Sequence, residues 1–451
     1  MKKVLSIILA LVMMLAACGT AAAEQEARKM ETAADADAFI AAFLGEHPEE
    51  MEGVWAFSAQ MEAALGQMGG IAVLAGQLSV LGTPDTVLPA YEGKFSGLKA
   101  FYIPCTQARQ DLILIIQDGN VAGIQIGSYT GKEEEKNGTD PYDSMELALP
   151  VPSLGELPGI LTVPKGDGPF PAVILLQGSG PSDKDETIGS LKPFRDIAEG
   201  LAENGIAVYR FDKRSYVYGN ELAENRQITL VDEYLEDTVN AVQLIARQDR
   251  IDPDRIYVLG HSLGGNAVPA IARELENAPV KACGFIMMAA SPRPLDVLMR
   301  EQYDFLYSLL PEITAEQQAE KDAIFAELDK LQDLDALGED DTVAGVYSAY
   351  WKWLADYDIL KAAEEITEPV LLLQGEEDYQ VTMEDFGIWK EAFGEKENWQ
   401  MISYPGLTHA FTEGQKTEGS AAYTRSGRMD AQVLRDIADF VARTGGNDPE
   451  K

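Results

Sequence analysis

The stretch Arg255-Ile-Tyr-Val-Leu-Gly-His-Ser-Leu-Gly-Gly265 decides the fold of this chain. It starts as an apolar strand pattern, matches G-x-S-x-G over residues 260–264, and is followed by a helical pattern over residues 266–276. A serine at such a strand-to-helix turn has a strained backbone that pushes its Oγ out of the sheet, and the flanking glycines let strand and helix pass closely. The stretch therefore predicts a nucleophile elbow at Ser262, although the five-residue match alone also fits a tight turn without chemistry.

From residue 145 onward, apolar strand patterns alternate with helical patterns. Helices are expected at residues 192–204, 231–247 and 266–276, and strands at residues 159–163, 172–176, 206–211, 255–259, 284–289, 370–373 and 400–404. Near-continuous apolar strands separated by helices are typical of a mostly parallel sheet covered by helices on both faces. We therefore predict an α/β domain over residues 145–447. A helix-rich insertion over residues 295–366 interrupts it and is expected over the carboxyl ends of the strands.

A small α+β domain is predicted over residues 31–130. Apolar residues at helical spacing occupy residues 31–70, and strand-like runs follow at 98–103, 112–117 and 121–126. This part of the sequence shows no nucleophile, ligand cluster or glycine loop, which favours a structural or substrate-presenting role. The charged, turn-rich residues 131–144 are predicted to be a linker.

The first 30 residues have the pattern of an export signal. Two lysines precede an apolar run over residues 4–15, which suits a signal-peptide core and is too short to span a membrane. The run ends in Leu15-Ala-Ala-Cys18-Gly, which resembles the bacterial lipobox, in which Cys18 would be lipidated and become the mature N-terminus. We therefore expect a signal peptide over 1–17, a tether over 18–30 and a lipoprotein at the outer face of the cytoplasmic membrane. Ordinary cleavage near residues 21–23, giving a secreted protein, is the alternative.

Composition excludes several classes of function. The 451 residues include 74 acidic and 36 basic side chains, a net charge of −38 that phosphate backbones and anionic lipid headgroups repel. Nucleic acid is therefore not an expected partner, and membrane contact is expected only through the lipid. Three cysteines are too few for a disulfide framework. The sequence shows no P-loop, dinucleotide fingerprint or metal-ligand spacing, so we predict no cofactor and no metal.

The chain has only three histidines, and this scarcity selects the candidate base. A serine hydroxyl becomes a nucleophile only when an imidazole accepts its proton. His47 lies in the small domain, and His261 adjoins Ser262 in the elbow, where its side chain is expected to point another way along the turn. His409, in the loop after the last predicted strand, is therefore the candidate base.

A carboxylate must hold that imidazole in the correct tautomer. The strand pattern at 370–373 is followed by Gln374-Gly-Glu-Glu-Asp378, which offers three carboxylates at the carboxyl end of a strand. The chain order is then serine, acid, histidine, as in α/β hydrolases. Glu376, Glu377 and Asp378 all fit this order, and each is also a plausible helix cap.

Residues 145–445 resemble the α/β-hydrolase superfamily, and specifically exported bacterial esterase-like members also described as serine aminopeptidase-like. The resemblance rests on the elbow and on Leu157–Pro164, Gln177–Asp185, Phe211-Asp-Lys-Arg214, Gln374–Asp378 and Thr408-His409. In the family the acid is the last residue of the Gly-x-x-Asp group, which selects Asp378. The family loop usually reads His-Gly where this chain has Gln177-Gly178, a change that leaves the backbone N–H groups in place. Residues 31–127 are more loosely similar to nuclear-transport-factor-like cone folds.

The resemblance implies a serine hydrolase that cleaves carboxylic esters through an acyl-enzyme. Ser262 would attack the carbonyl carbon, His409 would act as base and then as acid, and Asp378 would orient His409. Backbone N–H groups of Leu263 and Ser179 would hold the oxyanion.

Two alternatives to the esterase remain at this stage. The insertion holds 18 acidic and 5 basic residues, which disfavours strongly anionic substrates and could attract the α-amine of a small peptide. This keeps a serine aminopeptidase or amidase in view. A non-catalytic lipoprotein that uses the hydrolase fold as a binding module is an alternative of another class.

Overall fold

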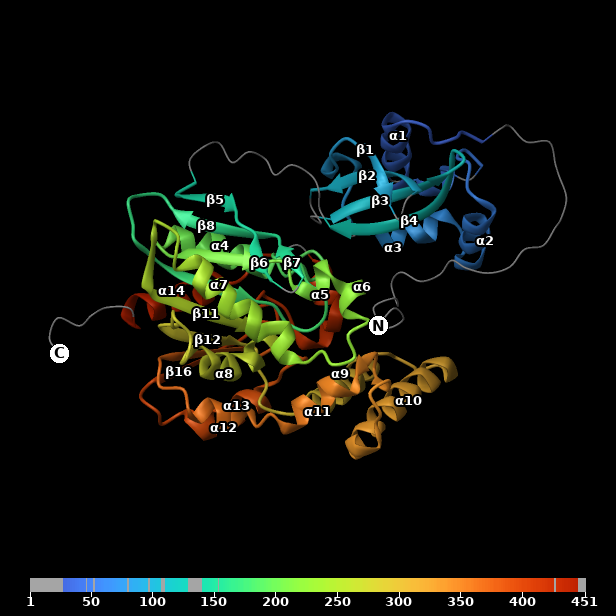
Figure 1. Ribbon diagram of the computed structural model, residues 1–451. Helices are drawn as coiled ribbons and strands as arrows, with labels where there is room; N and C mark the ends of the chain where they lie inside the picture. Colours follow the sequence, from blue (N-terminus) through green and yellow to red (C-terminus); the bar gives the residue numbers. More distant parts are fainter. Residues whose placement is uncertain are drawn as a thin grey trace. The chain divides into compact units, whose positions relative to one another are not determined.

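The computed structural model describes residues 27–444 except 46, 52, 79–80, 96–97, 107–109, 129–139, 153 and 426. The predicted signal peptide, Cys18 and most of the tether lie outside the described residues. Among the described residues, every helix is too short or too polar to span a membrane. The chain forms two compact units, residues 1–138 with 423–426, and residues 139–422 with 427–451 (Figure 1).

The smaller unit packs helices against an antiparallel sheet. The sheet order is β1 (Tyr91–Phe95), β2 (Leu98–Cys105), β3 (Gln110–Gln117) and β4 (Asn120–Ser128), and the helices are α1 (Ala33–Phe43), α2 (Ala59–Met68), α3 (Ile71–Leu78) and the short turns Pro48–Met51 and Pro84–Thr86. Helix α1 starts at a capping box in which Thr32 and Asp35 exchange hydrogen bonds. Phe39 and Phe43 on its inner face pack with Phe101 of β2 in one apolar core. His47 lies on the surface of this unit and contacts Glu49.

The larger unit contains an eight-stranded sheet in the order β16-β15-β12-β11-β9-β10-β8-β5. The six strands from β16 to β10 are parallel, and β8 and β5 add an antiparallel edge. Their bounds are β5 (Tyr142–Glu146), β8 (Gly159–Pro164), β9 (Phe170–Leu176), β10 (Ala207–Phe211), β11 (Ile251–His261), β12 (Gly284–Met288), β15 (Val370–Gly375) and β16 (Trp399–Tyr404), with a separate hairpin of β6 (Leu149–Val151) and β7 (Gly155–Leu157). The predicted mostly parallel sheet is confirmed.

The edge strand β5 corrects one predicted boundary. The sequence predicts a linker at residues 142–144, and the structure pairs these residues with Thr162–Pro164 of β8. Only Tyr142 of this strand is buried and the next four residues are exposed, so its sequence has the polar character of a linker. A strand with four of its five residues exposed does not produce an apolar run.

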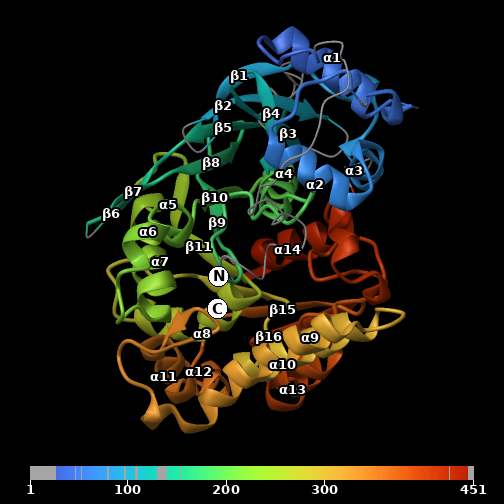
Figure 2. The ribbon, with the colours of Figure 1, turned by 90° about the vertical axis from the view of Figure 1, so that its right-hand side faces the viewer.

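Helices cover both faces of the sheet, because alternate residues of each strand point to opposite sides. Ile174 of β9 packs in the core beneath α7 (Glu236–Ile245), α8 (Leu263–Leu275) and α13 (Met383–Phe393). Its neighbours Val173 and Leu175 pack in the opposite core, beneath α4 (Pro193–Glu203) and α14 (Ala431–Thr444). Figures 1 and 2 show this layered arrangement. Full burial of one such aliphatic side chain stabilises the fold by about 1.5–3 kcal/mol.

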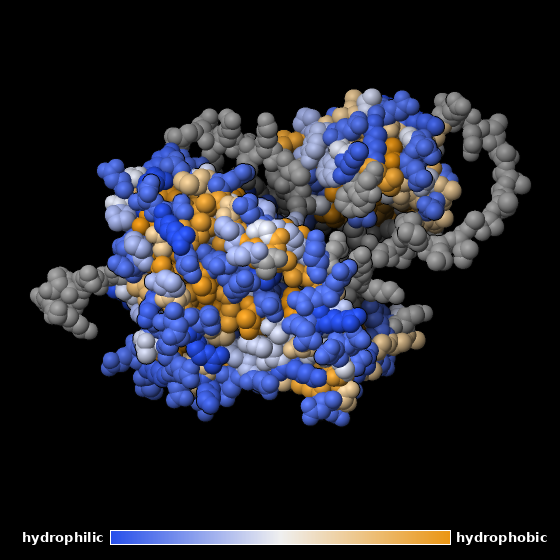
Figure 3. Space-filling model, in the orientation of Figure 1, coloured by the Kyte–Doolittle hydropathy of each residue, from blue (hydrophilic) through white to orange (hydrophobic). Residues whose placement is uncertain are grey.

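The insertion over residues 295–366 forms its own small core. It contains α9 (Leu295–Ser308), α10 (Ala315–Asp329), a short helix at Lys330–Ala336, the strands β13 (Thr342–Val343) and β14 (Val346–Tyr347), α11 (Ser348–Asp356) and α12 (Ile359–Glu364). Leu328, Val343 and Trp351 are buried together, so Trp351 serves the packing of the insertion itself. In Figures 1 and 2 its helices lie together along one side of the unit, and Figure 3 shows many hydrophilic side chains on the visible face.

Helix α9 lies over the carboxyl end of β15, where the insertion was expected. The Phe305 ring stacks on Tyr379, with ring centroids 5.4 Å apart, and Gln302 Nε2 donates to the carbonyl of Gln380 at 2.9 Å. The remaining short elements are α5 (Arg214–Val217), α6 (Gly219–Leu222), a π-helical turn at Val231–Leu235 and a 3₁₀ segment at Lys416–Thr424.

Five of the six parallel strands lead into segments that carry site residues at the same edge of the sheet. The segments after β9, β10, β11, β15 and β16 carry Gly178, Lys213, Ser262, Asp378 and His409, respectively. In open α/β sheets this carboxyl edge is where ligands bind. The fold thus brings residues more than 200 positions apart in the sequence to one place.

Candidate active site

Ser262 occupies a sharp turn between β11 and α8. Its backbone φ of 54° and ψ of −122° lie outside the regions that non-glycine residues usually adopt, and its N–H donates to the carbonyl of Met288 at 2.8 Å. A Cβ on Gly264 would lie 2.5 Å from Leu176 O and 2.6 Å from Gln177 O, so only glycine fits where α8 passes β9. The motif therefore forms the strained elbow that the sequence predicts.

Asp378 and His409 form a buried, directed pair. His409 Nδ1 is 2.6 Å from Asp378 Oδ2, and the two residues are 4% and 2% exposed. The other carboxylate oxygen accepts the N–H groups of Gln380 at 2.7 Å and Val381 at 3.0 Å, while Gln374 Nε2 donates to Oδ2 at 3.2 Å. These contacts fix the carboxylate, and a donating Nδ1 leaves His409 Nε2 as the acceptor nitrogen.

The other two candidate carboxylates do not contact His409. Glu376 Oε1 accepts the hydroxyl of Ser403 at 2.8 Å, and Glu377 Oε2 accepts the N–H of Lys416 at 3.1 Å. Among the three acids left open by the sequence, Asp378 is thus the one that the fold brings to the histidine.

His261 is held in a second polar pair and has no ring nitrogen free. Its Nδ1 lies 2.9 Å from Glu186 Oε1, and its Nε2 donates to the backbone carbonyl of His409 at 2.9 Å. The rings of His261 and His409 are 4.6 Å apart between centroids. His261 therefore ties the elbow to the loop that carries His409, and it does not compete as the base.

Glu186 also holds the loop after β9. Its Oε1 accepts the N–H of Gly178 at 2.6 Å, and a Cβ on Gly178 would lie 3.1 Å from the Cβ and 3.6 Å from the Oγ of Ser262. The loop backbone thus passes directly beside Ser262, the candidate nucleophile. Gln177, which replaces the family's usual histidine, donates from its side chain to the carbonyls of Phe211 at 2.5 Å and Asp183 at 3.2 Å.

Two backbone N–H groups beside Ser262 remain available. In the described part of the chain, the N–H groups of Leu263 and Ser179 donate to no protein acceptor. Leu263 is the first residue of α8, where backbone N–H groups lack partners within the helix and the helix dipole favours negative charge. Both groups are therefore suited to hold an oxyanion.

The Glu186–His261 pair predicts a defined dependence of stability on pH. Burial lowers the pKa of His261, but the Glu186 carboxylate, the His409 carbonyl and the more distant Asp378 together raise the pKa above its ordinary value. A raised folded pKa means that protonated His261 stabilises the fold fully below the unfolded pKa of about 6.5, and that this contribution is lost as pH rises through the folded pKa.

Glu186→Gln should therefore destabilise the protein most at mildly acidic pH. Loss of one partner from a buried pair costs about 3–5 kcal/mol, and urea unfolding at about pH 6 should show a loss of that order. The difference from wild type should shrink at alkaline pH, because both proteins then hold neutral His261. Exposed Glu49→Gln, which removes the partner of exposed His47, is the control and should change little. A Glu186→Gln deficit that is the same at both pH values would contradict this role of the pair.

Three buried polar residues next to the candidate site are not indicated by the sequence. Glu186, Lys213 and Tyr234 are buried around the Gly178 loop, and Lys213 Nζ donates to the Gly178 carbonyl at 2.7 Å. Lys213 lies within the Phe211-Asp-Lys-Arg214 motif. This motif supports the family resemblance, but the resemblance assigns no role to it. One feature of the sequence could have indicated Lys213 as a site residue. It directly follows a fully buried strand, at the carboxyl edge of the sheet.

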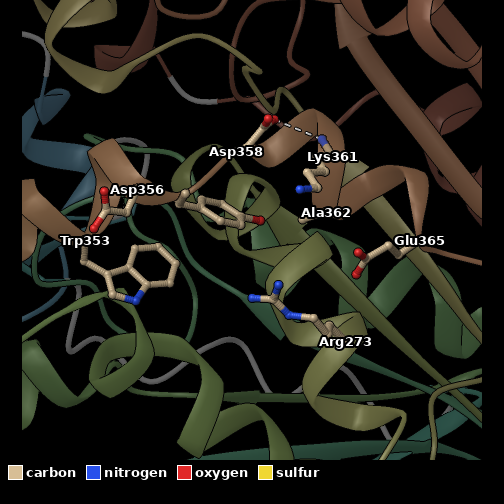
Figure 4. Close-up of a pocket in the computed structure, with 8 residues that line it drawn as sticks. Arg273, Trp353, Asp356, Asp358, Lys361, Ala362 and Glu365 are labelled. Atoms are coloured by element: carbon tan, nitrogen blue, oxygen red, sulfur yellow. Dashed lines mark hydrogen bonds between the residues drawn. The ribbon is translucent and has the colours of Figure 1, made fainter.

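A cavity of about 430 Å³ is lined by residues other than those of the candidate site. Figure 4 shows its lining, which comes from α8 and from the α11–α12 region: Arg273, Trp353, Asp356, Tyr357, Asp358, Lys361, Ala362 and Glu365. The Tyr357 hydroxyl donates to Asn266 O and accepts the N–H of Ala270, each at 3.1 Å, so this tyrosine anchors the insertion to α8. None of the predicted site residues lines the cavity. The described residues also include no group of three or more His, Cys, Asp or Glu side chains placed to hold a metal ion.

Ser262 lies on a strained strand-to-helix turn at the carboxyl edge of a mostly parallel sheet, and an Asp–His pair lies at the same edge. This arrangement is typical of an α/β hydrolase. Residues 188–415 match the family model described as serine aminopeptidase, S33. The chain is also 36% identical to esterase EstD of Thermotoga maritima over 333 aligned residues. These residues make up 74% of this chain and 76% of that protein. The chain therefore belongs to the serine aminopeptidase S33 family of α/β hydrolases, and it is a serine hydrolase.

Two further similarities are more distant. Dipeptidyl aminopeptidase BIII of Pseudoxanthomonas mexicana is 25% identical over 275 residues, which cover 59% of this chain and 35% of that protein. The solved structure of Est1E from Butyrivibrio proteoclasticus matches with a TM-score of 0.42 and 16% identity, covering 66% of this chain and 98% of that chain.

Proposed function

We propose that this protein is an esterase that hydrolyses carboxylic esters of small molecules with Ser262, His409 and Asp378 as a catalytic triad. The observation that carries the proposal is the buried 2.6 Å hydrogen bond between His409 Nδ1 and Asp378 beside the strained elbow. The name of the relative EstD adds support, since that protein is an esterase and shares 36% identity over most of both chains.

In the proposed mechanism, Ser262 Oγ attacks the ester carbonyl carbon while His409 Nε2 accepts its proton. The carbonyl oxygen becomes an oxyanion, which the N–H groups of Leu263 and Ser179 stabilise. Collapse of the tetrahedral intermediate breaks the bond to the alcohol oxygen, which takes the proton from His409. Water then attacks the acyl-enzyme by the same steps and releases the acid and free Ser262.

A serine aminopeptidase is the second candidate. The family description and the relative dipeptidyl aminopeptidase BIII favour it, and an insertion with 18 acids and 5 bases would attract a protonated α-amine. A binding module without catalysis is less well supported, because such a protein has no need for a buried Asp–His pair next to a strained serine.

A substrate panel tests the esterase against both alternatives. We expect kcat/KM for p-nitrophenyl acetate and butyrate to exceed that for alanine and leucine p-nitroanilides, with Ser262→Ala as the blank in each assay. Higher kcat/KM for the anilides would replace the esterase by the aminopeptidase. Folded protein that neither turns over these substrates nor reacts with a fluorophosphonate probe would favour the binding module, since that probe requires an activated serine.

A further inference from the structure

Lys213 is a buried amine that the proposed mechanism leaves without a role. It follows β10 and is 2% exposed, and its Nζ donates to Gly178 O at 2.7 Å, to the Tyr234 hydroxyl at 2.6 Å and to Glu233 Oε1 at 2.7 Å. An ammonium group has three N–H donors, whereas a neutral amine has two. Three acceptors around one nitrogen therefore match the charged form.

The Gly178 carbonyl accepts two donors and belongs to the peptide group of the candidate oxyanion donor. Besides Lys213, the Tyr234 hydroxyl lies 2.8 Å from Gly178 O and 3.0 Å from Gln177 O, so its one proton is shared between these two carbonyls. The Ser179 N–H is part of the same planar peptide, and in a trans peptide it points away from the carbonyl. Donors on the carbonyl side fix that plane, and hydrogen bonds in series polarise one another.

The Glu233 carboxylate compensates the charge of buried Lys213. Its Oε1 contacts Lys213, and its Oε2 accepts the hydroxyl of Tyr350, in α11 of the insertion, at 2.6 Å. Burial lowers the pKa of Lys213, and the Glu233 carboxylate opposes this shift. A continuous series of contacts thus runs from the insertion through Glu233 and Lys213 to the Gly178 carbonyl.

We propose that Lys213 is a positioning residue of the oxyanion hole, which orients and polarises the Gly178–Ser179 peptide so that the Ser179 N–H binds the oxyanion more strongly. This inference rests on the proposed acyl transfer and extends it to a residue that does not touch substrate. Because the oxyanion exists only in the transition state and the intermediate, Lys213 should affect kcat and leave KM nearly unchanged.

The test compares Lys213→Met with Lys184→Met, whose amine contacts Asp212 at 3.3 Å and does not reach Gly178. For p-nitrophenyl acetate, Lys213→Met should lower kcat by about 10- to 100-fold, less than the 100- to 1000-fold cost of losing a whole oxyanion donor. Affinity for a trifluoromethyl ketone, whose adduct with Ser262 carries an oxyanion, should fall in parallel with kcat/KM. Lys184→Met should match wild type in both measurements.

Tyr234→Phe keeps the inference testable if Lys213→Met does not fold. It removes one hydroxyl donor to Gly178 O and should lower kcat and ketone affinity by about 3- to 10-fold, because one neutral hydrogen bond is lost while Lys213 still donates to the same carbonyl. If the wild-type enzyme is active and either variant folds with wild-type kcat and ketone affinity, the proposed role of Lys213 is overturned. The proposed esterase function would then still stand. A rise in KM with unchanged kcat would also overturn the role of Lys213. A wild-type protein with no turnover of esters or anilides would instead remove the proposed function and this inference together.

Discussion

Ser262→Ala is expected to lower kcat for p-nitrophenyl acetate by roughly 10⁴- to 10⁶-fold, because loss of the nucleophile of a triad removes the covalent route altogether. The remaining rate would reflect only binding and the oxyanion N–H groups, which do not depend on the hydroxyl. Initial rates over a range of substrate concentrations measure the effect, and circular dichroism and thermal unfolding show whether the variant is folded.

Ser403→Ala is the matched control for Ser262→Ala. Ser403 lies on β16 in the same sheet, and its hydroxyl donates to Glu376, outside the Asp378–His409 pair. We expect its kcat to stay within about threefold of wild type, since the loss of one partly exposed hydrogen bond is a small local change. A folded Ser262→Ala protein that retains full ester turnover would exclude Ser262 as the nucleophile.

Asp378→Asn is expected to lower kcat by about 10⁴-fold, the effect that the same exchange has in a serine protease triad. The N–H groups of Gln380 and Val381 both donate to Oδ1, so the amide oxygen of the asparagine should occupy that position. The NH₂ group then faces His409 Nδ1 and donates to it. This forces the proton of His409 onto Nε2, where the ring can no longer accept the proton of Ser262.

Glu377→Gln is the control for Asp378→Asn, because it removes a neighbouring carboxylate that accepts the Lys416 N–H and lies outside the Asp378–His409 pair. Its kcat should equal that of wild type. If instead Asp378→Asn were fully active and Glu377→Gln were impaired, the acid would be assigned to the wrong residue of the Gly-x-x-Asp group. KM should change little in either variant, because neither carboxylate is expected to touch substrate.

The parallel strands could be predicted because burial on both faces makes each of them an apolar run. The runs at 172–176 and 284–289 correspond to β9 and β12 in the structure. Two edge strands, β5 and β1, could not be predicted for the opposite reason, whereas the edge strands β4 and β16 contain apolar runs and could be predicted. β5 buries only Tyr142, and β1, with the sequence Tyr-Glu-Gly-Lys-Phe, is also partly polar.

The site separates into residues that chain order indicates and residues that only the fold reveals. Ser262 and His409 could be proposed from one motif and a count of three histidines, and the structure brings Asp378 to His409. Glu186 and Lys213 could not be proposed, because a charged side chain in a sequence is normally expected at the surface. Their burial depends on partners 75 and 20 residues away, at His261 and Glu233, which no local pattern indicates.

The contact between Tyr350 and Glu233 matters for anyone who would engineer this enzyme. The insertion has its own core of Leu328, Val343 and Trp351, which makes it an attractive segment to exchange for one from a homologue when a new substrate range is wanted. Such a graft would keep the Ser262 elbow and the Asp378–His409 pair, since both lie outside residues 295–366. It would nevertheless leave the partly buried Glu233 without its hydroxyl donor unless the new segment places a tyrosine at the same point. A chimaera that preserves this one hydroxyl should therefore start from a higher turnover than one chosen only for the shape of its pocket.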